Sequence, residues 1–174
     1  GESLATIAER APEWAARDGK RIELVIEGRE VRLPPKLAAV LPGVMTHLVR
    51  NAVAHGVEGA ADRLAAGKNE VGTIWASAIV PDDAPDPIIT VEDDGAGIDL
   101  DEVVHRAKAL GLDTTMVPTE LVFHPGLSTR TTSDGLAGRG VGLDAVRSYL
   151  KEAGYAVHVF TEKGAGTKFV LAPA

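Results

Sequence analysis

The sequence predicts a two-layer α/β (α+β) sandwich, in which helices cover one face of a mixed, mostly antiparallel sheet. Strand-like and helical segments alternate irregularly along the chain, and antiparallel hairpins are expected at both ends. Such hairpins argue against a doubly wound parallel sheet. With 174 residues the chain is long enough to bury a hydrophobic core, and residues 1–174 are expected to form a single domain.

The N-terminal part is expected to form a helix and then a hairpin. Residues 3–17 have helical character, which Pro12 is expected to interrupt. Residues 21–27 (RIELVIE) are rich in β-branched and apolar residues and predict a strand. Gly28 and Arg29 predict a turn into a second strand at 30–33, its hairpin partner.

A long helix is expected from Lys36 into the fifties. Its apolar residues recur at spacings of three and four, which gives one buried stripe: Leu37, Val40, Leu41, Val44 and Leu48. Pro42 lies inside this pattern and suggests a kink or a break near the start of the helix. A short helix that ends at Gly67 is expected within residues 57–69.

The second half is expected to hold two strands, a helix, a long loop, a second helix and a terminal hairpin. The strands are placed at 71–80 and 87–93, the first helix at 99–110 with Asp99 as N-cap, the second helix at 142–153, and the hairpin at 155–161 and 167–171. Residues 111–138 show weak periodicity and are expected to form a mobile loop. A loop of this length in a compact domain is usually functional.

Composition excludes several kinds of site. The net charge is −7 and no dense run of Lys and Arg occurs, so no nucleic-acid surface is predicted. There are no cysteines, which excludes thiol nucleophiles and thiolate metal sites. No run approaches the roughly 20 apolar residues of a membrane helix, and residues 1–11 lack a signal pattern. We therefore expect no membrane insertion and a cytoplasmic location. An anionic ligand would require local positive charge or a metal ion.

The stretch HLVRNAVAHG carries polar residues at every fourth position, His47, Asn51 and His55. Residues at this spacing lie along one edge of a helix, with a drift of about 40° per step. They could be hydrogen-bonded inside the protein at a helix–sheet boundary, but each would then need a buried partner. The pattern is not a zinc motif, whereas the Asn oxygen could be a ligand for Mg²⁺.

The stretch VEDDGAGID ends a strand with two carboxylates and two glycines. A strand-ending turn would explain these residues without any ligand. Alternatively, the Asp93 carboxylate accepts a hydrogen bond from a ligand amino group, while Gly95 and Gly97 allow a flat ring to lie against the main chain.

The stretch GLAGRGVGLDAVR places three glycines before a helix: Gly138, Gly140 and Gly142. Their N–H groups could point at one anion, helped by the helix dipole, and Arg139 would add a positive charge. A flexible hinge is the competing interpretation. The stretch is neither a Walker loop nor a Rossmann fingerprint.

In this order, HxxxNxxxHG, DxGxG, GRGVG and GxGTxF resemble the GHKL superfamily of ATPases and kinases, which has the Bergerat-type ATP-binding fold. The segments HLVRNAVAHGVE, RLAAGKNEVGTI, VEDDGAGID, FHPGLST and GRGVGLDAVR are most similar to the catalytic module of chemotaxis-type histidine kinases, the CheA family. The resemblance covers about residues 20–171.

The resemblance implies ATP and Mg²⁺ as cofactors. It implies that Asn51 holds the Mg²⁺ that bridges the phosphates, with His47 and His55 close to the phosphates and ribose. The adenine amino group would bind Asp93, helped by a water and Thr167. The loop at about 111–138 would be an ATP lid. Further nucleotide contacts implied in this way are Gly95 and Gly97 in the adenine pocket, Phe123 in the lid, and Gly138, Arg139, Gly140 and Gly142 around the phosphates. Lys68 is given no ligand contact.

The resemblance also bears on the reaction. The hydrolases of the superfamily carry Glu four residues before the Asn, as a general base for water, and here that residue is His47. This favours transfer to a positioned nucleophile, hence a histidine kinase module that phosphorylates a histidine on a separate phosphotransfer domain. Coupling and dimerisation domains are expected in the full-length protein. The alternatives are a GHKL ATPase with a hydrolysis-driven cycle and a degenerate docking module. Three departures bear on the latter: Ala54 for Asp, Leu127 for Phe and Ala137 for Ser.

Overall fold

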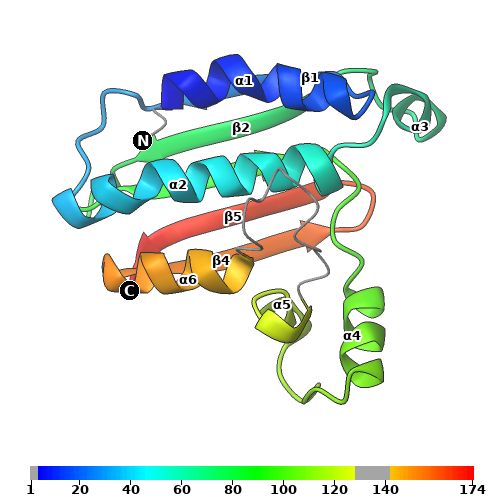
Figure 1. Cartoon of the computed structure of the whole chain (residues 1–174). Coiled ribbons are helices and arrows are strands. Elements are labelled where there is room, and N and C mark those ends of the chain that lie inside the picture. Colours follow the sequence, from blue (N-terminus) through cyan, green and yellow to red (C-terminus); the bar gives the residue numbers. More distant parts are fainter. Residues whose placement is uncertain (1–3, 128–141) are drawn as a thin grey trace.

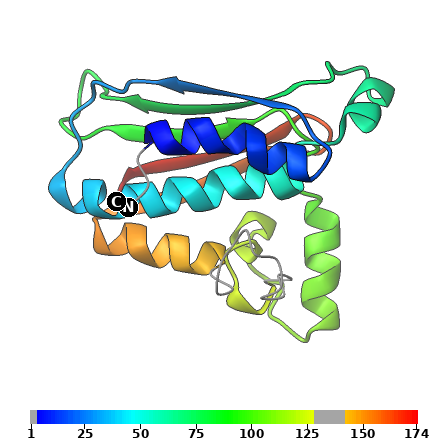
Figure 2. The same cartoon turned by 45° about the horizontal axis from the view of Figure 1, so that its top comes forward.

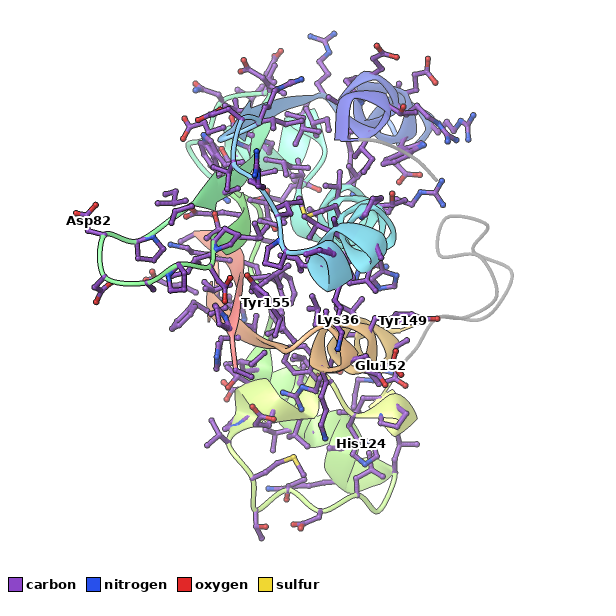
Figure 3. The ribbon with its side chains drawn as sticks, turned by 90° about the vertical axis from the view of Figure 1, so that its left-hand side faces the viewer. Lys36, Asp82, His124, Tyr149, Glu152 and Tyr155 are labelled. Carbon is purple, nitrogen blue, oxygen red and sulfur yellow. The ribbon has the colours of Figure 1, made fainter. Side chains whose placement is uncertain are left out.

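Five strands form one sheet in the order β1-β2-β3-β5-β4, and three long helices, α1, α2 and α6, lie side by side on one face of it (Figure 1). The computed structural model describes residues 4–127 and 142–174. Viewed from the side, the strands and the three helices form two layers (Figure 3). Asp82, in the loop between β2 and β3, points away from the helical layer (Figure 3). The predicted fold class, a two-layer sandwich, is confirmed.

The sheet is mixed and mostly antiparallel. Its strands are β1 (Ile22–Glu27), β2 (Gly72–Ile79), β3 (Ile88–Asp93), β4 (Tyr155–Glu162) and β5 (Gly166–Pro173). Strand β1 pairs in parallel with β2, and every other neighbouring pair is antiparallel. The C-terminal hairpin and the β2–β3 hairpin agree with the sequence patterns.

Helices lie before β1 and in the connections from β1 to β2 and from β3 to β4. Their bounds are α1 Leu4–Arg17, α2 Pro35–Asn51, a π-helix η1 at Ala52–Gly56, α3 Ala60–Ala65, α4 Leu100–Ala109, α5 Pro118–Leu121 and α6 Leu143–Glu152. A 3₁₀ turn covers Pro125–Leu127. The predicted N-cap of α4 is confirmed, because the Asp99 side chain accepts a hydrogen bond from the Glu102 N–H at 3.1 Å.

The predicted hairpin at residues 21–33 is wrong. The chain turns at Gly28, where the Val31 N–H donates to the Gly28 carbonyl at 3.0 Å, and residues 30–33 form no strand. The partner of β1 is β2, which begins some fifty residues further along the chain. Residues 30–33 are few and are followed by Pro34 and Pro35, which have no N–H groups to donate to a sheet. The longer strand β2 therefore pairs with β1 instead.

Neither proline breaks its helix, so the interruption predicted at Pro12 is wrong, and of the kink or break predicted at Pro42 the break does not occur. Helix α1 runs through Pro12, whose exposed position lets solvent reach the carbonyl that loses its helical partner. Helix α2 likewise runs through Pro42 and continues into η1. Together α2 and η1 are long and apolar enough to span a membrane, but half of this stretch is buried inside the protein. Its apolar stripe therefore belongs to the core.

Part of the segment predicted as a loop at 111–138 has regular structure. It contains α5 and the 3₁₀ turn, and its residues 128–138 lie outside the described part of the chain. Leu121 and Phe123 are buried, and the Arg147 guanidinium of α6 lies 4.0 Å from the centre of the Phe123 ring. Arg147 also pairs with Glu120 at 2.7 Å. These contacts attach α5 to α6.

Candidate functional site

A cavity of about 350 Å³ opens where helix α2 ends, a volume typical of small-molecule sites. Its walls come from α2 and η1, the ends of β3 and β5, the start of α6, α4, and the segment after α5. Figure 2 shows α4 and α5 beyond the helical layer, on the side of α6. Of the predicted site residues, seven line this cavity: His47, Asn51, His55, Asp93, Gly97, Gly142 and Thr167. Leu127, one of the three departures from the family pattern, also lines it.

The edge of the long helix forms one wall. His47 and Asn51 lie in α2, whereas His55 lies in η1, where the Val57 N–H donates to the Ala52 carbonyl at 2.7 Å. In a regular α-helix each four-residue step advances the edge by about 40°. The wider π-turn reduces the rotation per residue, so His55 stays in the cavity lining with the other two.

Asn51 carries an oxygen that the fold leaves unused. Its Oδ1 atom is buried and has no hydrogen-bond partner among the residues that the structure describes. A buried acceptor without a donor is costly, and native proteins rarely keep one without a reason. A hard cation such as Mg²⁺, which prefers oxygen ligands, would satisfy it. In residues 4–127 and 142–174 no group of three or more His, Asp or Glu could hold a metal alone. Further ligands would have to come from a bound molecule.

Asp93, the last residue of β3, also lines the cavity and is 6% exposed. Burial raises the pKa of its carboxyl to about 6, although hydrogen bonds from the backbone N–H groups of Gly95 and Thr167 act in the other direction. The Gly95 N–H donates to Oδ1 at 2.9 Å. A buried carboxylate with free acceptor capacity, bordered by the apolar side chains Val91, Ile98 and Phe169, suits a flat heterocycle with an exocyclic amino group.

The glycines keep the space around Asp93 narrow. A Cβ atom at Gly95 would lie 2.0 Å from the Gly56 carbonyl oxygen, and one at Gly56 would lie 2.9 Å from the Asp93 carboxylate. The Gly56 carbonyl instead accepts a hydrogen bond from the Ala96 N–H at 2.8 Å. The backbone of Gly97 has φ of 75°, a conformation that residues with a side chain rarely adopt. Gly95 itself is not part of the lining. Its contribution is the N–H group that holds the Asp93 carboxylate.

Other predicted residues lie elsewhere. Phe123 is packed in the core beneath Arg147, while its neighbours Val122 and His124 line the cavity. Gly138, Arg139 and Gly140 fall outside the described residues. Ala54 is not in the lining; its carbonyl accepts a hydrogen bond from the Lys20 ammonium at 3.0 Å.

Three polar lining residues were missed in the sequence: Arg106, His124 and Asp144. Asp144 lies in the first turn of α6. Arg106 gives the cavity a cationic group in the described part of the chain. It is one of several charges on an amphipathic helix, and only the packing of α4 beyond the sheet shows where it lies. The ring of His124 is fixed by its own turn, because Nδ1 accepts the Gly126 N–H at 2.9 Å. No sequence signal separated any of these three residues from ordinary surface residues.

Comparison with known proteins points to one family. Residues 40–174 match the family model described as histidine kinase-, DNA gyrase B-, and HSP90-like ATPase. The chain is 37% identical to chemotaxis protein CheA of Klebsiella aerogenes over 91% of its length, and 35% identical to that of Cereibacter sphaeroides over 98%. It spans about a quarter of the length of these curated relatives, 25% in each case.

Solved structures show the same fold. The histidine kinase domain of a blue-light activated histidine kinase from Erythrobacter litoralis matches 97% of this chain, and 63% of its own chain, with a TM-score of 0.56 and 19% identity. At this identity the match speaks for the fold alone.

Proposed function

Since the chain belongs to the family of histidine kinase-, DNA gyrase B- and HSP90-like ATPases, as a domain of the CheA-like kinases, we propose that its cavity binds Mg·ATP. We propose further that it transfers the γ-phosphoryl group to a histidine on a separate phosphotransfer domain. The observation that carries this proposal is the presence of two groups in the lining of one cavity: the buried Asp93 carboxylate, whose pKa burial raises, and the Asn51 Oδ1 atom, which has no hydrogen-bond partner among the described residues.

The adenine ring would occupy the Asp93 end. Its amino group would donate to the carboxylate, and the apolar side chains of Val91, Ile98 and Phe169 would contact the ring faces. Gly97, with no side chain, would let the ring approach the main chain. Thr167 lies in register with Asp93 across the β3–β5 pair, so its hydroxyl group is within reach of the same edge.

The phosphates would extend towards the helix edge. Mg²⁺ bound with ATP would neutralise phosphate charge, and the Asn51 Oδ1 atom would be its protein ligand. His47, His55 and Arg106 line the same cavity and can donate hydrogen bonds to phosphate oxygens. This donor set suits a triphosphate in a protein whose net charge of −7 would otherwise repel it.

Transfer rather than hydrolysis is favoured by the residue at position 47. In the proposed reaction the bond between the γ-phosphorus and the bridging oxygen breaks, and a bond to an imidazole nitrogen of the acceptor forms. ADP leaves with the bridging oxygen, and the acceptor imidazole loses its proton. No carboxylate is placed at position 47 to activate water, so attack by water is expected to be slow.

The acceptor and the dimerisation and coupling domains would lie outside this chain, in the same or another polypeptide. We propose a cytoplasmic location, where ATP is available. None of the proposed steps involves nucleic acid or membrane insertion.

The direct test is calorimetric binding of ATP and ADP to this chain, with and without Mg²⁺, for wild type and the Asp93→Asn variant. We expect Mg²⁺-dependent binding in wild type and its loss in the variant. Phosphoryl transfer is then measured with radiolabelled ATP and the isolated phosphotransfer domain of a CheA protein. Absence of nucleotide binding at high protein concentration would favour a docking module, and rapid turnover without an acceptor would favour an ATPase.

A further inference from the structure

Four charged side chains form a cluster behind the turn that carries Asp93. They are Glu58, Arg63, Lys68 and Asp94, and none of them lines the cavity. We call this group the clamp. It is built from three separate segments: the residues after η1, helix α3 with the turn that follows it, and the end of β3.

Arg63 is the buried centre of the clamp and is only 1% exposed. Its guanidinium donates to the Glu58 carboxylate at 3.2 Å and to Asp94 Oδ2 at 3.1 Å. Its Nε donates to the Asn69 carbonyl at 2.6 Å. A charge this deeply buried is tolerated only with full pairing, so the position of Asp94 relative to α3 is strongly constrained.

Lys68 acts on the backbone of the turn itself. Its ammonium donates to the carbonyls of Asp94 at 3.0 Å and Gly95 at 2.8 Å, and to the Glu58 carboxylate at 2.8 Å. These three bonds use all three donors of the side chain. The same Gly95 whose carbonyl is held by Lys68 donates its N–H to Asp93 Oδ1 at 2.9 Å. Lys68 and the Asp93 carboxylate are therefore bonded to the same residue, Gly95. Lys68 holds the carbonyl of the residue whose N–H group orients the carboxylate.

The clamp also joins the two walls of the cavity. Gly56 ends the helix that carries Asn51 and His55, and its carbonyl accepts the Ala96 N–H at 2.8 Å. Two residues later Glu58 pairs with Lys68, which holds the carbonyls of the opposite wall. Gly56 and Gly95 are closely packed, because a methyl group at Gly95 would overlap the Gly56 carbonyl. A small displacement of the turn would therefore move Asp93.

On the premise that the cavity binds ATP, we propose that Lys68 and Arg63 are positioning residues that hold the Asp93 carboxylate and thereby set the preference for adenine over a 6-oxo purine. Adenine presents an amino group to Asp93, whereas hypoxanthine presents an oxygen at the same place. A site built to accept one hydrogen bond discriminates strongly only while its acceptor is correctly placed.

The test compares ADP with inosine diphosphate, whose base is hypoxanthine, both with Mg²⁺, on wild type and the Lys68→Met variant. Affinities are measured by calorimetry and, for the weaker ligand, by displacement of a fluorescent adenine nucleotide. We expect Lys68→Met to weaken ADP roughly tenfold, the equivalent of one charge-assisted hydrogen bond, and to weaken inosine diphosphate much less. The ratio of the two affinities should fall accordingly.

Matched variants separate positioning from general destabilisation. Lys163→Met removes an exposed ion pair, the 3.2 Å contact with Asp99, and should leave the ratio unchanged. Lys68→Arg keeps the charge and should restore most of the ratio. Glu58→Gln loosens the anchor of Lys68 and should lower the ratio in the same direction, which keeps the test available if Lys68→Met folds poorly.

The outcomes are distinct. Equal losses for both nucleotides, or an unchanged ratio in Lys68→Met and Glu58→Gln, would overturn the positioning role while leaving the nucleotide site in place. Wild-type protein that binds neither nucleotide would overturn the proposed function and this inference together. A selective loss for ADP that Lys68→Arg reverses would support the inference.

Discussion

Replacing Asp93 with Asn should stabilise the protein without nucleotide while it removes the nucleotide site. Burial raises the pKa of this carboxyl from 3.8 to about 6. A difference of roughly two pH units corresponds to about 3 kcal/mol that the folded state loses when the buried group ionises. Asn does not ionise and keeps an oxygen that can accept the Gly95 N–H. We expect the variant to gain about 1–3 kcal/mol at pH 8, less than the full value because its amide N–H groups need partners.

The gain should depend on pH in a defined direction. Between pH 3.8 and about 6 the folded wild type binds more protons than the unfolded chain, so wild-type stability falls as pH rises through this window. The Asn variant lacks this loss. The difference in the free energy of unfolding should therefore be near zero at pH 4 and grow to its full size above pH 7.

Urea unfolding followed by circular dichroism at pH 4, 6 and 8, without nucleotide, measures this difference. The neighbouring Asp94→Asn variant is the control and should be destabilised, by roughly 2 kcal/mol, because Asp94 pairs with buried Arg63 at 3.1 Å. With Mg·ADP at 100 times its Kd, the free energy of unfolding should rise by about 2.7 kcal/mol for wild type and should not change for Asp93→Asn. A variant that is less stable than wild type at pH 8, or a gain that does not change with pH, would refute the reasoning.

Three further substitutions probe the site. Gly95→Ala places a methyl group 2.0 Å from the Gly56 carbonyl oxygen and should reduce ADP affinity at least tenfold, measured by calorimetry; unchanged affinity would contradict the close packing. His47→Glu introduces the carboxylate that the hydrolases carry and should raise ATP hydrolysis without an acceptor at least tenfold, measured by phosphate release. Ala54→Asp should change ADP affinity less than threefold, because position 54 lies outside the cavity lining and its carbonyl contacts Lys20; a larger effect in the same calorimetric titration would show that this position influences the site.

Local pattern was enough to identify the helix edge and the Asp93 turn. His47, Asn51 and His55 stand out because helical periodicity places them together, and Asp93 because a strand runs directly into it. All four line one cavity. The partner of β1 was missed because its pairing with β2 joins segments far apart in the chain. No local pattern indicates such a pairing, whereas the turn at Gly28 indicates a nearby hairpin.

The missed and misplaced residues have a common cause. Phe123 was expected to contact the nucleotide from the lid region, yet Val122 and His124 on either side of it line the cavity and Phe123 packs under Arg147. Neighbouring residues in this short segment point in different directions, so adjacent positions can face the core or the cavity. Only tertiary packing decides which residue faces which. Arg106 was missed for the same reason.

The lining of the cavity holds two groups that are unfavourable for folding. Asp93 is buried at a cost in stability, and within the described residues the Asn51 Oδ1 atom is buried without a donor. Replacement by less polar side chains would lower both costs, so neither group is explained by the core that surrounds it. Each cost would be offset by a different part of one ligand: an amino group at Asp93 and a hard cation at Asn51. Groups that violate the rules of stable folding are expected at functional sites, and two such groups in one cavity are the reason to propose a ligand that carries both an amino-bearing ring and a metal-bound polyanion.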